Sequence, residues 1–82
     1  MKIKLTPKQN AVIYLLQNGW ELITDSEMRG AEVCNSTHQF HINGGLFWNL
    51  VEKGLIFQNR MKGDWYTLTE LGKEIKTKPV TI

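Results

Sequence analysis

The stretch LVEKGLI, residues 50–56, predicts the end of an amphipathic helix, a glycine stop and the start of a strand. Gly54 stands just past the helix, where glycine readily adopts the left-handed backbone conformation that ends a helix. Toward the N-terminus, Asn43 is the expected cap of this helix, and Gly44-Gly45 weakens its first turn. We expect one helix face to enter the core, with Leu46, Phe47, Leu50 and Val51, while the outer face carries Trp48, Asn49 and Glu52.

Toward the C-terminus, the pattern predicts a β-hairpin that leads directly into another helix. Strands are expected over 55–61 and 65–68, joined by a turn at 62–64. Thr69 is the expected cap of the final helix, because a threonine hydroxyl can accept a bond from the first turn. The inward-facing residues expected on that helix are Leu71 and Ile75.

The first helix is marked at both ends and is predicted over 7–18. Thr6 and Gln9 form a T-x-x-Q capping box, and Pro7 occupies the first helical position, where its missing N–H costs nothing. Asn18-Gly19 provides the exit from the helix. One apolar face is expected to enter the core, formed by Val12, Leu15 and Leu16 with Ile13 at its edge.

The middle of the chain carries strand signals. Residues 20–24 are rich in aromatic and β-branched side chains, 31–34 follow a break at Arg29-Gly30, and 38–42 alternate between polar and apolar. We therefore expect β-rich structure between the two longer helices.

Size and composition predict one non-membrane domain over residues 1–82, with an ordered core of about 5–76 and a loose tail from Thr77. The single cysteine, Cys34, excludes an internal disulfide, so a reducing, cytoplasmic setting is expected. The longest apolar run of the N-terminal region, Ala11 to Leu16, is too short to cross a bilayer.

The formal net charge is only +2, but the charges are unevenly distributed. Basic residues gather at the start of the chain, at the hairpin tip and at the end of the chain. They are Lys2, Lys4 and Lys8, then Arg60 and Lys62, then Lys73, Lys76 and Lys78. Four acids occupy the middle: Glu21, Asp25, Glu27 and Glu32. This segregation favours one basic surface and one acidic surface.

Two motifs, FWNLVEKGLI at 47–56 and YTLTELGK at 66–73, resemble the recognition helix, wing and closing helix of MarR- and PadR-type winged-helix regulators. The chain is also similar to small winged-helix proteins of phages and mobile elements. The resemblance implies an α+β winged helix of three helices with a C-terminal hairpin wing, in which the β-rich middle replaces or crowds the usual second helix. It further implies duplex-DNA binding by a transcriptional regulator or a mobile-element accessory factor.

If DNA is the partner, the outer face of helix 43–53 would enter the major groove and the hairpin would reach the backbone. Asn43 and Asn49 would then read base edges, because an amide can pair with adenine. The residues expected to contact phosphates are Lys53, Arg60, Lys62 and Lys8. A second hypothesis is a protein-interaction module without DNA binding, and homodimerisation remains open under both hypotheses.

The aromatic residues are expected to fill the core, with one exception. Trp20, Phe40, Phe47, Phe57 and Trp65 are expected to bury most of their area. Trp48 lies off the core face of its helix. It would either pack against the middle segment or anchor a protein partner, since exposed tryptophans concentrate binding energy.

No enzymatic site or cofactor is expected. Cys34, His38 and His41 give C-x3-H-x2-H, but a structural zinc site needs four ligands and the sequence has no second cysteine. Nothing identifiable orients His38 toward Cys34 as a catalytic base. Gly44-Gly45 is too short for a phosphate-binding loop.

Overall fold

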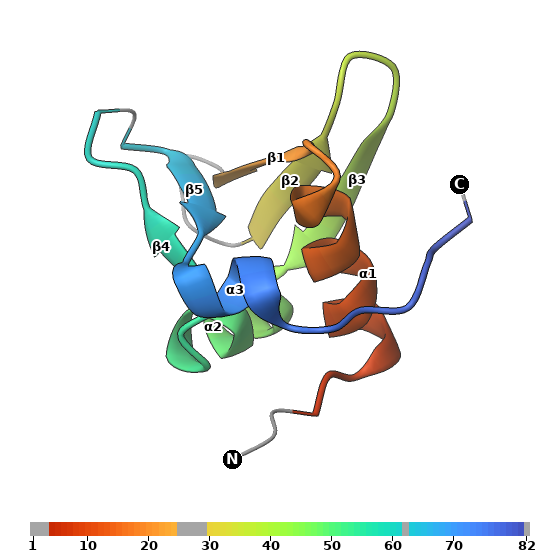
Figure 1. Cartoon of the computed structure of the whole chain (residues 1–82). Helices are drawn as coiled ribbons and strands as arrows, with labels where there is room; N and C mark the ends of the chain where they lie inside the picture. The colour runs from red at the N-terminus through yellow and green to blue at the C-terminus, as the bar shows by residue number, and fades with distance from the viewer. Residues whose placement is uncertain (1–3, 25–29, 62, 82) are drawn as a thin grey trace.

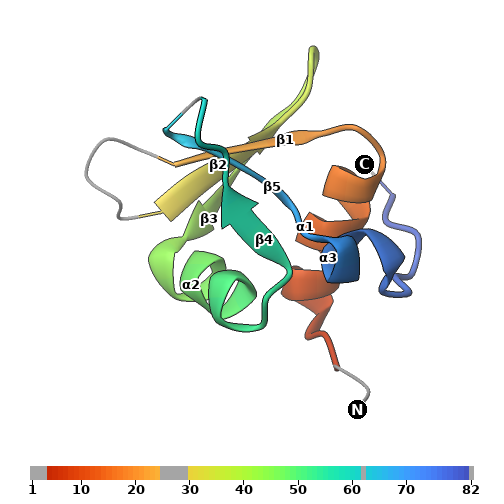
Figure 2. The ribbon, with the colours of Figure 1, turned by 60° about the vertical axis from the view of Figure 1, so that its left-hand side comes forward.

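In the computed structural model, which describes residues 4–24, 30–61 and 63–81, a five-stranded sheet carries three helices. The elements are α1 (Pro7–Gln17), β1 (Glu21–Thr24), β2 (Gly30–Cys34), β3 (Gln39–Asn43), α2 (Gly44–Glu52), β4 (Ile56–Gln58), β5 (Trp65–Leu68) and α3 (Glu70–Glu74). The strand order is β3-β2-β1-β5-β4, and every neighbouring pair is antiparallel. The helices gather on one side of the sheet (Figures 1 and 2).

The winged-helix prediction is wrong. The chain forms an α+β fold in which strands dominate the middle, and the order of its elements differs from that of a winged helix. In place of a second helix, β2 and β3 form a hairpin with five residue pairs, from Gly30↔Asn43 to Cys34↔Gln39. The strand signals of the sequence therefore outweigh the resemblance of the motifs that follow this segment.

Gly30 shows why this hairpin needs a glycine at its start. A Cβ atom at Gly30 would clash with the backbone carbonyl oxygen of Ile42 on the neighbouring strand. The glycine is thus required for the close approach of β2 and β3, a role that glycine commonly has within strands.

The sheet joins two units that are each local in sequence. The first contains β1, β2 and β3, and the second is the β4–β5 hairpin. They meet where β1 pairs with β5, through Leu22↔Tyr66 and Ile23↔Trp65. The hairpin is thereby built into the sheet and does not project as a separate wing.

The core lies between the sheet and the helices. Its largest fully buried side chains are Phe47, Ile13, Leu22, Leu50, Leu55 and Val33. Tyr66 also packs there, with its ring edge-on to Phe47 at a centroid distance of 4.7 Å. Three inward predictions are wrong: Phe40, Phe57 and Leu71 are 43%, 52% and 44% exposed. In the short helix α3, Gly72 takes the buried position instead of Leu71.

Both longer helices begin and end much as their capping residues predict. The Thr6–Gln9 capping box is present at α1, and the Asn43 side chain accepts a hydrogen bond from the Leu46 N–H at 2.8 Å. Gly54 has a φ of 73° just past α2. Phe47 and Leu50 are buried, as expected, while Trp48, Asn49 and Glu52 face solvent.

Two hydrogen bonds from Thr69 join the start of α3 to the residues that follow α2. The Thr69 N–H donates to the Leu55 carbonyl at 3.0 Å, and the Thr69 hydroxyl donates to the Gly54 carbonyl. The same hydroxyl accepts from the Gly72 N–H at 3.1 Å. A Cβ at Gly72 would clash with the Leu55 carbonyl oxygen, so the backbones touch here. The two motifs at 47–56 and 66–73 therefore meet in this junction.

The tail after α3 was expected to be loose, but two amide side chains of α1 hold it. Asn10 pairs with both backbone groups of Lys78, accepting from its N–H at 2.7 Å and donating to its carbonyl at 3.0 Å. Gln17 donates to the carbonyls of Gly72 and Ile75 and accepts from the Thr77 hydroxyl at 2.7 Å. Residues 75–78 consequently run along α1 (Figure 1).

Candidate nucleic-acid interface

Five lysines from three parts of the chain lie around the N-terminal end of α1. We call them the lysine cluster: Lys4, Lys8, Lys53, Lys76 and Lys78. Lys53 Nζ donates to the Lys4 carbonyl at 3.1 Å, which joins the end of α2 to the residues before α1. Lys76 and Lys78 line one shallow pocket together with Leu5 and Pro7. Lys8 stands in the first turn of α1.

The local structure adds positive potential to this end of the molecule. The unpaired N–H groups at the start of a helix carry a partial positive charge. The first turn of α1 contains no acidic residue that would offset this charge. The Gln9 side chain, which is buried, accepts from Lys53 Nζ at 2.8 Å and so fixes that ammonium group beside the helix. An ammonium group has three N–H donors, so one donor of Lys53 remains beyond these two bonds.

The cluster contains most of the positive charge that the structure describes. Seven Lys and Arg residues fall within 4–24, 30–61 and 63–81, and five of them are in the cluster; the other two are Arg60 and Lys73. None of the five forms an ion pair with a described residue, whereas Lys73 pairs with Glu70 at 3.7 Å. Unpaired ammonium groups gathered at one end are what an anionic partner requires.

The predicted DNA-contacting residues are divided by the fold. Lys8 and Lys53 belong to the lysine cluster, while Arg60 lies in the β4–β5 turn, far from the N-terminal end of α1 in both ribbon views (Figures 1 and 2). Asn43 caps α2 through its side-chain oxygen. Asn49 is exposed on α2. Lys62 lies outside the described residues.

Sequence reasoning missed Lys4, Lys76 and Lys78 as members of one site. The sequence signal was present, because lysines gather at both chain ends. What the sequence does not contain is the Asn10–Lys78 contact, which brings two residues 68 positions apart into hydrogen-bond distance.

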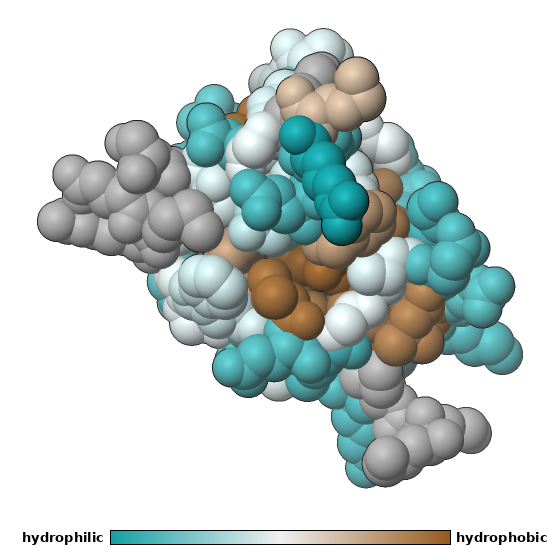
Figure 3. Space-filling view, turned by 90° about the vertical axis from the view of Figure 1, so that its left-hand side faces the viewer, coloured by the Kyte–Doolittle hydropathy of each residue, from teal (hydrophilic) through white to brown (hydrophobic). Residues whose placement is uncertain are grey.

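A second surface lies on the side of α2 and β4. Figure 3 shows hydrophobic side chains at the centre of this face and hydrophilic ones around them. Trp48 of α2 is 44% exposed and meets Phe47 edge-on at a centroid distance of 5.2 Å. Trp48 thus has both a packed edge and a solvent-accessible surface, as an interface anchor would.

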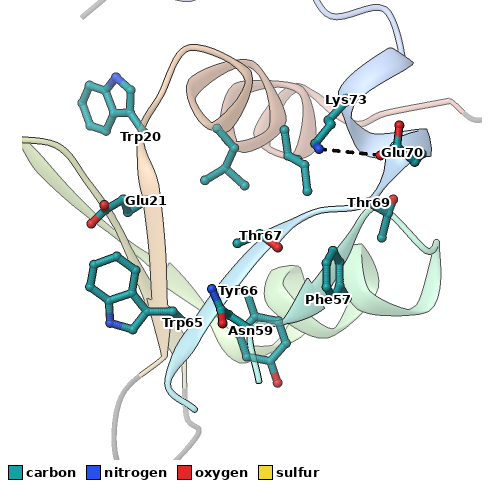
Figure 4. Close-up of a pocket in the computed structure, with 12 residues that line it drawn as sticks. Trp20, Glu21, Phe57, Asn59, Trp65, Tyr66, Thr67, Thr69, Glu70 and Lys73 are labelled. Carbon is teal, nitrogen blue, oxygen red and sulfur yellow. Dashed lines mark ion pairs between the residues drawn. The ribbon is translucent and has the colours of Figure 1, made fainter. Parts of the chain in front are cut away.

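An aromatic pocket of about 750 Å³ opens beside β5 (Figure 4). Trp20 and Trp65 lie on one side with Glu21 between them, and Phe57 lies on the other side. Lys73 at the rim is paired with Glu70. Flat aromatic walls suit a stacked ring, but among the lining residues the one lysine is already neutralised, so the pocket offers little to a phosphate.

The C-x3-H-x2-H residues are engaged separately. His38 Nδ1 is 2.8 Å from the Thr37 hydroxyl, and His41 Nδ1 is 3.2 Å from a Glu32 carboxylate oxygen. Within 4–24, 30–61 and 63–81, no three His, Cys, Asp or Glu side chains are placed to hold a metal ion.

Comparison of the chain with protein-family models, curated proteins and solved structures found no match. In the part of the chain that the structure describes, no helix is long and apolar enough to span a membrane. Any function must therefore be argued from the surfaces themselves.

Proposed function

We propose that the protein binds duplex DNA through the lysine cluster, as a regulatory or accessory factor. The observation that supports this proposal is the convergence of five lysines on the N-terminal end of α1, none of them ion-paired with a described residue. The contact differs from a recognition helix in a groove, because the outer face of α2 carries Trp48, Asn49 and Glu52 and no positive charge. The lysines would contact phosphates, which gives affinity without reading sequence.

Counterion release sets the expected strength of this binding. Five phosphate contacts predict a slope of about −4.5 for the logarithm of the association constant against that of the salt concentration. Affinity would then fall roughly 500-fold between 50 and 200 mM salt. A monomer with so few contacts should bind non-specific duplex in the micromolar range or weaker near physiological salt.

The test is fluorescence anisotropy of a labelled random duplex, titrated with protein at several salt concentrations. The variant Lys8→Gln/Lys76→Gln/Lys78→Gln removes three charges whose ammonium groups make no contact within the described residues. It should flatten the salt slope by about 2.7 and weaken binding at low salt. The comparison variant Arg60→Ala/Lys62→Ala removes two charges from the hairpin that the sequence favoured, and it should leave the salt slope unchanged.

The reverse ranking of the two variants would place the contact on the hairpin and contradict the lysine cluster. Absence of binding at low salt would remove the DNA proposal altogether. A single-stranded oligonucleotide of the same length serves as a comparison. Tighter binding to it than to the duplex would contradict the choice of duplex DNA.

The exposed Trp48 favours a second function, docking on a protein partner through the outer face of α2. Under this alternative, Trp48→Ala would abolish partner binding and leave the DNA titration unchanged. Loss of DNA binding in Trp48→Ala would instead move the nucleic-acid contact onto α2.

A further inference from the structure

An apolar groove of about 380 Å³ lies between α1, the edge strand β3 and the start of α2. Most of its apolar lining comes from α1, β3 and α2, and Val33 of β2 contributes as well. The residues of the three main elements are Ala11, Val12 and Leu15 on α1, Phe40 and Ile42 on β3, and Leu46 on α2. Phe40 is 43% exposed, and Leu46 is only partly buried. Solvent therefore reaches apolar side chains of the groove on both β3 and α2.

One wall of this groove is a strand whose outer backbone edge has no neighbouring strand. Among residues 4–24, 30–61 and 63–81, β3 is the last strand of the sheet and pairs with β2 alone. In an antiparallel pair, residues whose backbone groups face the partner alternate with residues whose groups face away. The Asn35 N–H donates to the His38 carbonyl, which fixes where the alternation starts. The backbone N–H and C=O groups of Phe40 and Ile42 therefore face β2, and those of His41 face away from it. His41 therefore offers an N–H and a C=O at the edge.

The chain's own tail already approaches the groove. Asn10 holds both backbone groups of Lys78, and two residues later Val80 and Thr81 complete the groove lining. Val80 is partly buried, but neither Val80 nor Thr81 hydrogen-bonds to β3. A β-branched side chain is thus accommodated in the groove while the backbone of the edge strand stays unpaired.

The charges around the groove select a type of partner. Lys8 lines it without an ion pair, Lys78 precedes Val80 closely, and the lining residues include no Asp or Glu. A second copy of the tail would bring Lys76 and Lys78 against Lys8, so like charges oppose that occupant. An acidic segment would be attracted.

We propose that this groove binds an extended acidic peptide of a partner protein, which pairs with β3 and displaces Val80 and Thr81. An extended peptide that adds to a sheet edge gains affinity from backbone hydrogen bonds and specificity from alternate side chains. Here the alternate side chains would enter between β3 and α1, where the β-branched Val80 lies in the free protein. The tail is then an internal competitor. This site adjoins the proposed DNA contact and shares Lys8 with it.

The test uses a fluorescein-labelled peptide, Glu-Pro-Val-Thr-Ile-Glu, which retains the order of the tail but exchanges its lysine charge for acids. It is titrated into the full chain and into a chain that ends at Lys78. If the tail occupies the groove nine-tenths of the time, truncation should tighten binding about tenfold. A peptide with Gln in place of both Glu residues should bind several-fold more weakly.

Two variants locate the binding. Ala11→Trp fills the groove from α1 and should abolish peptide binding to the truncated chain. Asn49→Trp places the same side chain on the exposed face of α2 and should leave the affinity unchanged. Circular dichroism of both variants checks that the fold is retained. Equal loss in both variants would contradict the groove as the site.

Amide hydrogen exchange reads out the pairing itself. Bound peptide should slow exchange of the His41 amide and leave that of Phe40, already paired with β2, unchanged. The proposal is overturned if the truncated chain binds no peptide, or if peptide binds without protecting His41. Dimers of the full chain that disappear on truncation would make a second copy the occupant and would equally overturn it. The DNA titration of the truncated chain keeps this result separate, because every lysine of the cluster is retained.

Discussion

The two segments that follow β5 are held in opposite ways. α3 is attached through backbone groups and a buried glycine, where Thr69 bridges Gly54 and Leu55 and Gly72 touches the Leu55 carbonyl. The tail is attached through two side-chain amides, and its Lys78 contact with Asn10 is exposed. The first attachment belongs to the core, so breaking it should unfold the protein. The second should open while the rest of the fold stays intact.

The largest loss of stability is expected from Gly72→Ala. Its new Cβ meets the Leu55 carbonyl oxygen, which belongs to the backbone and cannot move aside cheaply. A backbone clash of this kind lies at the upper end of the cost of overpacking, about 3 kcal/mol or more, which outweighs the roughly 1 kcal/mol that alanine gains over glycine within a helix. Urea denaturation should show a lower free energy of unfolding with an unchanged m-value.

Gly45→Ala is the matched control. A Cβ there meets only the Asn43 side-chain oxygen at 3.4 Å, an ordinary contact. Because Gly45 lies in the first turn of α2, alanine should stabilise the protein by up to about 1 kcal/mol. Similar destabilisation by both substitutions would mean that the close approach at Gly72 is unimportant.

A smaller loss is expected from Thr69→Val, which preserves the shape of the side chain and removes its hydroxyl. The hydroxyl caps α3 and donates to Gly54. Loss of a capping residue costs about 0.5–2 kcal/mol, and urea denaturation measures it. Thr69→Ser keeps the hydroxyl and should retain most of the stability, whereas an unchanged free energy of unfolding in Thr69→Val would mean that the hydroxyl contributes nothing.

The smallest effect on global stability is expected from Asn10→Ala. The substitution removes two hydrogen bonds to Lys78 that are exposed to solvent. Because water competes for the same groups, each bond contributes about 1 kcal/mol or less. The tail should nevertheless be released, which limited trypsin proteolysis after Lys76 would detect as faster cleavage. A large drop in the free energy of unfolding would instead make the tail part of the core and erase the contrast with α3.

The sequence predicted local structure well and the arrangement of elements poorly. Capping residues located α1 and α2, because Thr6, Gln9 and Asn43 act on their own helix ends. Strands were expected in the middle and are present, but their pairing into one sheet with the C-terminal hairpin depends on contacts distant in sequence. The winged-helix prediction was wrong because its two motifs describe the junction at Gly54 and Thr69, which a different sheet also accommodates.

The candidate sites likewise depend on contacts between residues that are distant in sequence. Lys8 and Lys53 were expected to contact phosphates, yet their convergence with Lys4, Lys76 and Lys78 requires the tail to fold back on α1. Phe57 was assigned to the core because aromatic residues usually bury, but it lies on the exposed face of β4, opposite Thr67, and lines the pocket beside β5. Strand alternation alone does not reveal which face the helices cover.

The pairing of β1 with β5 also determines the order in which the molecule can form. The β2–β3 and β4–β5 hairpins close short loops, whereas Leu22↔Tyr66 joins residues separated by most of the chain. Closing that long loop carries the greater entropic cost, so the encounter of the two hairpin units is the expected kinetic barrier to folding. Substitutions at this seam should slow folding, whereas those that free the tail should leave the folding rate unchanged.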